Sequence, residues 1–385
     1  MQNPAIWNNP RFRAWLFQIL AILLVGGFFA MLAANTVDNL RQLNVASGFG
    51  FLGHTAGFGI SQTLIDYSEA SSYGRAFLVA LLNTLLVAGI GIFLAAILGF
   101  VVGIARLSSN WLVARLAAVY IEIFRNIPLL LQILFWYTAV LSNLPAPRNS
   151  FEIGSLLINN RGMYLPAPVA ETGFGGVAVA AAVALLGVVF LRYWSNMRRT
   201  ATGRGAPVFW PALGLLTGLP LMVFWLSGSP LHFEAPVLRG FNFTGGIRAI
   251  PELLALLFAL SIYTAAFIAE IVRSGIQAVN WGQSEAAVAL GLRRSEALRL
   301  VVLPQALRVI IPPLTSQFLN LTKNSSLAAA LAYPELASVF AGTVLNQTGQ
   351  AVEVLTITMA VYLSLSLLTS LAMNYYNSRI ALVER

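Results

Sequence analysis

The single lysine of the chain, Lys323, lies inside an apolar stretch from about residue 309 to 330. Ser316 and Asn320 precede it at helical spacing, so the three side chains form one polar stripe on a helix. A charged group inside a membrane span is costly and by default indicates function. Two interpretations remain open. Either the stripe lines a polar path through the membrane, together with Asn324 and Ser325, or Lys323 is neutralised by a glutamate on a neighbouring span.

Two glutamate–arginine pairs have the same spacing of three residues, Glu122 with Arg125 and Glu270 with Arg273. Residues three apart are neighbours on a helix, so each pair can close within its own helix. Ion pairs near an interface are usually structural, which favours a gate or packing role over substrate binding. Asn83, near the outer end of another apolar stretch, either lines the entrance of the path or mediates a contact between helices.

The composition requires a membrane. The chain has 385 residues, of which 58% are hydrophobic and 10% charged, whereas a soluble domain has about 25% charged residues. The net charge of +9 fits arginines that collect in cytoplasmic loops, so nucleic-acid binding is not expected. With no cysteine and two histidines far apart, neither disulfides, thiolate chemistry nor a metal site is expected.

Residues 282–313 form a polar island between apolar stretches. Strong helix formers from Glu285 onward are closed by Gly291, which predicts a short helix. A second short helix is expected to start at Ser295, as its N-cap, and to stop or kink near Pro304. Two short helices with small residues and arginines could form a surface to which another protein binds. Glu285 either pairs with a basic residue of that partner or caps its own helix.

The spacing in this island resembles the cytoplasmic coupling loop of ABC importer permeases. The matching positions are Glu285, Ala286, Ala287, Gly291, Val301, Leu303 and Pro304. Flanking segments at residues 263–273, 304–308 and 323–327, and a further one at 122–130, resemble the polar amino-acid uptake branch. The long segment between residues 141 and 246 resembles the general L-amino-acid and the glutamate, glutamine, aspartate and asparagine permeases.

The resemblance implies an all-α integral membrane protein with a type I importer core of five helices plus additional helices. It implies a permease subunit for amino acids, polar or acidic L-amino acids above all, in the bacterial inner membrane. It also implies three kinds of partner: a second, related permease, two ATPase subunits and a periplasmic amino-acid-binding protein. A stand-alone, ion-coupled secondary transporter is the alternative, and a non-transporting membrane scaffold is a further one.

The chain carries no phosphate-binding loop. Such a loop needs Gly-Lys followed by Ser or Thr, and Lys323 follows Thr322. The chain is therefore not expected to be an enzyme or to hold a cofactor. ATP and Mg²⁺ are expected in the partner ATPase, docked on the coupling loop.

About eight membrane spans are predicted from apolar runs of roughly 20 residues. Their approximate ranges are 14–34, 76–105, 117–141, 175–191, 209–227, 250–272, 309–330 and 352–372. Residues 1–75 then hold an anchor helix and a periplasmic loop, and residues 76–141 begin the core. Residues 142–249 hold inserted periplasmic segments and an extra helix pair. Residues 250–385 complete the core, with the coupling loop at 276–308.

Arginine counting sets the orientation. With a cytoplasmic N-terminus, 15 arginines fall in inner segments and 6 in outer loops. The positive-inside rule therefore places both termini and the coupling loop in the cytoplasm.

Overall fold

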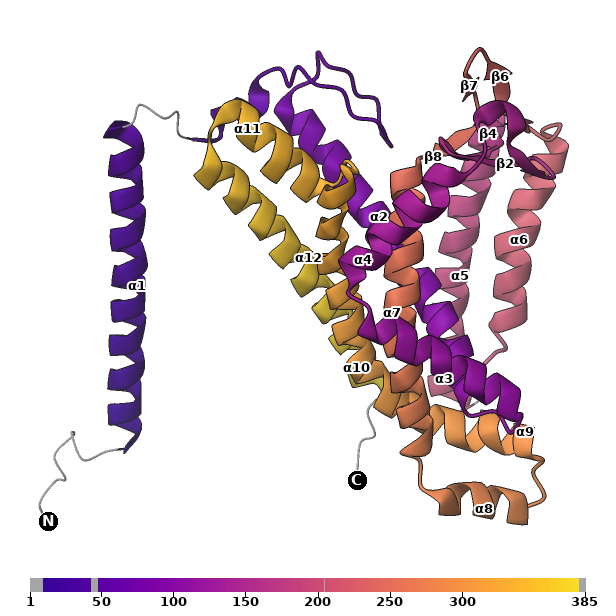
Figure 1. The fold of residues 1–385 in the computed structure, drawn as a ribbon. Coiled ribbons are helices and arrows are strands. Elements are labelled where there is room, and N and C mark those ends of the chain that lie inside the picture. Colours follow the sequence, from indigo (N-terminus) through magenta and orange to yellow (C-terminus); the bar gives the residue numbers. More distant parts are fainter. Residues whose placement is uncertain (1–9, 43–47, 204, 381–385) are drawn as a thin grey trace, which may run out of the picture. The chain divides into compact units, whose positions relative to one another are not determined.

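The computed structural model describes residues 10–42, 48–203 and 205–380, and it is predominantly helical (Figure 1). Within the described residues, seven helices are long and apolar enough to cross a membrane, or up to eight if a bent pair counts as one span. The prediction of about eight spans is therefore confirmed. Arg204 and Arg385, which were expected in inner segments, lie outside the described residues.

The helices follow the predicted apolar runs and extend beyond most of them. The longest are α1 (Pro10–Gln42), α2 (Tyr73–Arg106), α5 (Phe174–Thr202), α6 (Phe209–Leu226), α7 (Pro251–Gln277), α10 (Leu303–Asn324) and α12 (Ala351–Ile380). Between α10 and α12 the chain forms a 3-10 segment (η7, Ser325–Leu331), a π-helical segment (η8, Ala337–Val344) and α11 (Leu345–Thr348).

The third predicted span is broken at Pro128. It consists of α3 (Trp111–Asn126) and a second helical stretch beginning with α4 (Leu129–Leu134), bent by 105°. Ile127, the residue before the proline, takes an extended conformation, as proline requires of its predecessor. The Gln132 amide donates to the freed carbonyls of Phe124 and Ile127 at 3.0 and 2.9 Å. The break is thus built into the local sequence.

The helix after Gly291 was expected to stop or kink near Pro304. It does not stop there. It begins at Arg294 (α9, Arg294–Ala297) and passes through a π-helical turn (η6, Leu298–Val302) directly into α10. In that turn the Leu303 N–H donates to the carbonyl of Leu298, five residues back. Pro304 then lies directly after the π-helical turn, at the start of α10.

The chain divides into two compact units, residues 1–134 with 255–385, and residues 135–254. In the first unit, glycines allow close approach of α2 to its neighbours. A Cβ on Gly99 or Gly103 would come within 2.6 or 2.7 Å of Ile268 or Val272 of α7. Small residues four apart are the usual device by which membrane helices bring their backbones together. Gly91 similarly faces Leu321 of α10.

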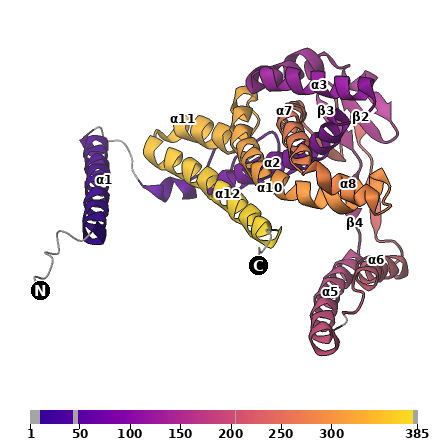
Figure 2. The same ribbon diagram turned by 90° about the horizontal axis from the view of Figure 1, so that it is seen from below.

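The second unit contains a helix pair and three small antiparallel sheets. α5 and α6 lie side by side, as Figure 1 and Figure 2 both show. The largest sheet has the order β1 (Phe151–Ile153), β2 (Leu156–Asn159), β3 (Gly162–Leu165), β8 (Ile247–Ala249). The others pair β4 (Ala167–Ala170) with β5 (Leu231–Glu234), and β6 (Val237–Arg239) with β7 (Asn242–Thr244).

The inserted segments at 142–173 and 228–249 therefore contain strands that the sequence analysis did not predict. Strand β3 pairs with β8 from the other side of the helix hairpin, with Tyr164 opposite Arg248. Tyr164 is fully buried and donates to Asn242 at 2.7 Å. The two segments pair with each other through β3 with β8 and β4 with β5.

Candidate functional site

The helix that carries the predicted coupling motif is α8 (Trp281–Ala289), and its ends are set by sequence. Asn280 caps the start by accepting from the Gly282 N–H at 2.9 Å. At the end, Gly291 adopts a φ of 84°, and the N–H groups of Gly291 and Leu292 return to the carbonyls of Val288 and Ala287. This pair of hydrogen bonds around a glycine with positive φ is the Schellman motif. The predicted helix and its glycine stop are confirmed.

The Glu285 carboxylate reaches back one turn toward the first residue of α8. It is exposed and accepts a hydrogen bond from the Trp281 indole N–H at 2.8 Å. The helix N-terminus is capped by Asn280, so the second suggestion for Glu285, that it caps its own helix, is not what the structure shows. An exposed carboxylate held by an indole remains available to a basic group on a partner.

The small residues of this helix differ in their exposure. Ala287 is buried while Ala286 is exposed, so one face packs inward and the other is bare. The helical stretch that begins with α9 lies alongside α8 (Figure 1). The Gln305 side-chain amide donates to the Gln283 side-chain oxygen at 3.3 Å. Leu303 is half-buried and Pro304 exposed. The expected N-cap at Ser295 is wrong, because the helix begins one residue earlier and Glu296 accepts from the Arg293 N–H at 2.8 Å.

The polar stripe of α10 is present as predicted from spacing. Ser316, Asn320 and Lys323 are all exposed, while Leu314 and Leu321 on the opposite face are buried. In the part of the chain that the structure describes, no carboxylate lies at salt-bridge distance from Lys323. The described residues therefore give no support to the alternative in which a glutamate of this chain neutralises Lys323. Lys323 stands where α10 ends and η7 begins.

Three other residues assigned to the path from sequence lie differently. Asn324 is half-buried, and Ser325 is fully buried and donates to the Thr322 carbonyl at 2.7 Å. Asn83 is fully buried, and its amide donates to the carbonyls of Gln62 and Pro334 at 2.9 and 2.8 Å. The structure brings neither Asn83 nor Ser325 onto the exposed face of the stripe. The contacts of Asn83 are those of its alternative, a link between segments.

Sequence reasoning missed a buried carboxylate next to this region. Glu335 is fully buried and accepts from the N–H groups of Ala337 and Ser338, at 2.9 and 2.7 Å, and from the Tyr362 hydroxyl of α12 at 2.6 Å. It thereby caps η8 and ties it to α12. The signal available in the sequence was Pro334-Glu335 followed two to three residues later by small residues, which is typical of a helix start.

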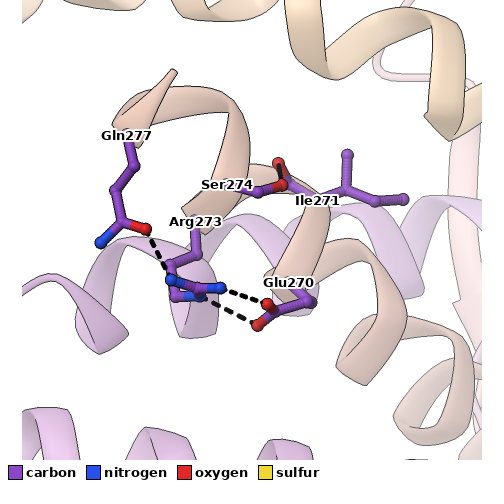
Figure 3. Close-up of polar contacts among 5 residues, drawn as sticks. All are labelled: Glu270, Ile271, Arg273, Ser274 and Gln277. Atoms are coloured by element: carbon purple, nitrogen blue, oxygen red, sulfur yellow. Dashed lines mark hydrogen bonds and ion pairs between the residues drawn. The ribbon is translucent and has the colours of Figure 1, made fainter. Parts of the chain in front are cut away.

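The two glutamate–arginine pairs meet in one pocket of about 310 Å³. Arg273 donates to both carboxylate oxygens of Glu270, from Nε at 3.0 Å and from Nη2, and it also donates to Gln277, as Figure 3 shows. This pair closes within one helix, as predicted. Glu122 and Arg125 form no ion pair with each other in the described part of the chain, so the prediction of this second pair is wrong. The Arg125 guanidinium instead lies over the Phe267 ring, 5.1 Å from its centroid.

Arg106, at the end of α2, also lines this pocket and was not predicted to take part. Its sequence signal was only its position as the last residue of an apolar run. The pocket therefore gathers charged groups from the ends of three helices, α2, α3 and α7. These helices all belong to the first compact unit.

The seven or more candidate spans among the described residues, with a capped polar helix between them, are those of an integral membrane protein. Its family follows from comparison. Residues 176–382 match the family described as the binding-protein-dependent transport system inner membrane component. The chain belongs to this family, as a permease of the amino-acid ABC transporters.

Three relatives match almost end to end. The chain is 56% identical to the putative amino-acid ABC transporter permease protein YhdX of Escherichia coli, over 98% of this chain and 96% of that one. It is 55% identical to the general L-amino acid transport system permease protein AapQ of Rhizobium johnstonii, over 98% and 94%.

The third relative is the glutamate/glutamine/aspartate/asparagine transport system permease protein BztB of Rhodobacter capsulatus. The identity is 43%, over 98% of this chain and 96% of that one. Among solved structures, the chain is similar to an amino acid ABC transporter crystallised with histidines, with 21% identity, a TM-score of 0.48 and coverage of 80% of this chain and 95% of that one. The family resemblance drawn from the coupling motif is confirmed.

Proposed function

We propose that this chain is one of two permease subunits of a bacterial ATP-driven importer for L-amino acids, with polar and acidic amino acids as its main substrates. The names of the relatives, a general L-amino-acid system and one for glutamate, glutamine, aspartate and asparagine, support this range. The fold contributes a five-helix type I core, and α1, α5 and α6 are additions to it.

The observation that carries the proposal is the uncovered stripe of Ser316, Asn320 and Lys323 on α10. A lysine facing lipid at the middle of a span costs about 2.5–3.5 kcal/mol on insertion scales. The stripe therefore faces an aqueous path or another protein. A second permease, related to this one and packed against this face, encloses the path, and the Lys323 ammonium meets the substrate carboxylate there.

The ATPase is a separate chain. The sequence holds no phosphate-binding loop, so ATP and Mg²⁺ bind to two ATPase subunits that grip α8 on the cytoplasmic side. Glu285, Ala286 and Ala287 form the gripped surface, and the tight turn at Gly291 passes the movement to the helix that continues into α10. Closure of the ATPases pulls on these helices as rigid levers. Both chain termini lie in the cytoplasm, and a periplasmic binding protein delivers the amino acid from outside.

Affinity purification from the native membrane tests this assembly. The tagged chain is extracted in mild detergent, its partners are identified by mass spectrometry, and ATP hydrolysis is measured on the eluate. We expect a soluble ATPase and a second permease, with hydrolysis stimulated by periplasmic extract plus amino acid. Recovery of the chain alone, in a detergent that keeps a known ABC importer intact, would favour the ion-coupled alternative.

A further inference from the structure

The sheet formed by β1, β2, β3 and β8 has one face that is apolar at every position. Directly opposite residues of an antiparallel pair lie on the same face, and so does every second residue along a strand. The register of the pairings therefore carries one face across all four strands. This apolar face consists of Phe151, Ile153, Leu156, Ile158, Met163, Leu165, Ile247 and Ala249.

The apolar face is not the covered face of the sheet. All of its residues are described, and none of them is buried. Phe151, Ile153 and Ile247 are 56%, 66% and 50% exposed. The covered face is the opposite one, where Tyr164 is fully buried against Phe243 of β7, with ring centroids 5.1 Å apart. The same row of that opposite face also holds Glu152, Leu157 and Arg248.

This arrangement reverses the usual one. An antiparallel sheet normally packs its apolar face on a core and turns its polar side chains to water. Here β7 packs against the face that carries a glutamate and an arginine, and the uniformly apolar face is bare. A contiguous exposed apolar surface indicates a site that meets a membrane or another protein.

The connections of the strands place the sheet beside the bilayer. Only Ile250 separates β8 from α7, so at about 3.3 Å per extended residue β8 ends within about 7 Å of a membrane span. Glu252, in the first turn of α7, accepts a hydrogen bond from the Tyr137 hydroxyl at 3.0 Å. A tyrosine that reaches a polar group at the end of a span is typical of the membrane–water interface. The sheet therefore starts at this interface.

The helix pair of the same compact unit has lipid as its surroundings. Residues 171–173 join β4 to α5, and residues 227–230 join α6 to β5. None of the described residues of α6 is buried, and the pair exposes large apolar side chains such as Leu186, Phe190 and Trp225. Uncovered helices that are apolar all round are membrane spans that face lipid. The apolar face of the sheet thus continues a surface that already lies in lipid.

We infer that the apolar face lies on the bilayer, with its side chains in the headgroup region next to the start of α7 and the opposite face toward water. Interfacial segments bury their apolar side by about 5–10 Å. This depth fits the strand β1, which is an edge of the sheet. An open edge is not tolerated in the hydrocarbon core, whereas water reaches its backbone groups at the interface.

A protein partner is the competing occupant of the apolar face. A soluble protein that binds and leaves uses a surface about as polar as the rest of a protein, with hydrogen-bonding groups in it. None of the side chains of the apolar face carries a charge, a hydroxyl or an amide. Because acyl chains need no hydrogen bonds, the face suits lipid better than a transient partner. A permanently attached subunit is distinguished from lipid by the test.

The test uses single cysteines, because the chain contains none. Ile153→Cys places a fluorescent nitrobenzoxadiazole label on the apolar face. Glu152→Cys is the matched control, since Glu152 is the adjacent, exposed residue of β1 on the opposite face. Each variant is purified with the subunits it retains and reconstituted in nanodiscs, with or without a phospholipid that carries a nitroxide just below its headgroup. The wild-type chain, which takes no label, gives the background from other subunits.

We expect the label at position 153 to emit at shorter wavelength than the label at position 152 and to be quenched several-fold more strongly by the nitroxide lipid. The same result is expected for Ile247→Cys on β8, at the other edge of the sheet, because the whole face lies on the bilayer. Neither readout requires ATP or transport, so failure here and failure of the proposed importer are distinguishable.

Three results would overturn the inference. Equal emission and equally weak quenching at positions 152 and 153 would show that the apolar face is in water. Emission at shorter wavelength from position 153 without quenching by the nitroxide lipid would show that a protein subunit covers the face. Quenching at position 247 alone would show that only the strand next to α7 meets lipid.

Discussion

Lys323 is the residue on which the proposed transport path depends most directly. Its identity and spacing with Ser316 and Asn320 were sufficient to predict the stripe, because a helix places residues three and four apart on one face. The burial of Asn83 and Ser325 could not be predicted, because the sequence does not show whether a polar side chain on a helix faces a neighbouring segment or stays exposed. The Asn83 contacts reach Pro334, 251 residues away.

Replacement of Lys323 tests its role. Lys323→Gln should raise the KM for amino-acid uptake about tenfold or more, because a hydrogen bond to a charged group contributes about 1.5–3 kcal/mol. Lys323→Arg keeps the charge and should retain most of the affinity. Uptake is measured with radiolabelled amino acid in cells that express equal amounts of each variant. An unchanged KM in Lys323→Gln would show that the ammonium does not bind the substrate.

Glu335 illustrates a structural role at the same scale. Glu335→Ala should lower the Tm of the purified protein by about 5 °C or more, because it leaves three part-buried donors without this acceptor, at about 1–3 kcal/mol each. Glu171→Ala is the control, because Glu171 is exposed and its carboxylate bonds the exposed His232 ring at 2.8 Å. Equal Tm values for both variants would show that the hydrogen bonds of Glu335 do not stabilise the fold.

At the scale of elements, the coupling helix was predicted well and the helix after it less well. The polar and small residues of α8 and its closing glycine act locally, so sequence is sufficient. The path of the chain through Pro304 was misjudged because a π-helical turn at 298–302 absorbs the proline, and this depends on packing around that turn. The break at Pro128 followed from proline chemistry, but the stabilising Gln132 bonds were not foreseen.

The coupling role of α8 makes a direct prediction. Glu285→Lys and Gly291→Pro should leave membrane insertion intact and lower substrate-stimulated ATP hydrolysis by the complex at least about tenfold, since loss of a charged interface partner costs about 2–5 kcal/mol. Gly291→Pro acts differently, because proline cannot adopt the φ of 84°. Trp281→Phe is the control, because it removes only the indole bond and keeps the Glu285 charge. Full stimulation in both variants would exclude α8 as the coupling element.

The close contact of α2 and α7 gives a prediction on stability. Gly103→Ala should lower the Tm, because the added Cβ falls 2.7 Å from Val272 Cβ and 2.8 Å from a backbone oxygen. Overpacking of this kind costs about 1–3 kcal/mol. Gly89→Ala, on the same helix with nothing within 4 Å, should be neutral or slightly stabilising. If both substitutions behaved alike in a thermal denaturation assay, the glycine contact would not be a determinant of packing.

For the whole molecule, hydrophobic runs predicted the spans because lipid fixes the length of each apolar segment. The small sheets at 151–170 and 231–249 were not predicted. Their strands have three or four residues, too few for a clear period, and β3 pairs with β8 across an intervening helix hairpin. Pairings of this kind are decided by tertiary contacts that sequence spacing does not contain.

The exposed stripe also supports the proposal that a second subunit completes the path. Ser316, Asn320 and Lys323 are uncovered, and no described carboxylate neutralises the lysine. A second permease and the ATPases are therefore part of the proposed importer. A transport assay with defined components is the measurement that joins them.

The most direct test of the importer is amino-acid uptake into proteoliposomes that contain the purified complex. ATP is enclosed in the vesicles, the binding protein with radiolabelled glutamate or glutamine is added outside, and an ion gradient without ATP serves as the comparison. The account predicts uptake that requires both ATP and the binding protein and is lost in Glu285→Lys. Uptake driven by the ion gradient alone, with no effect of ATP, would contradict it.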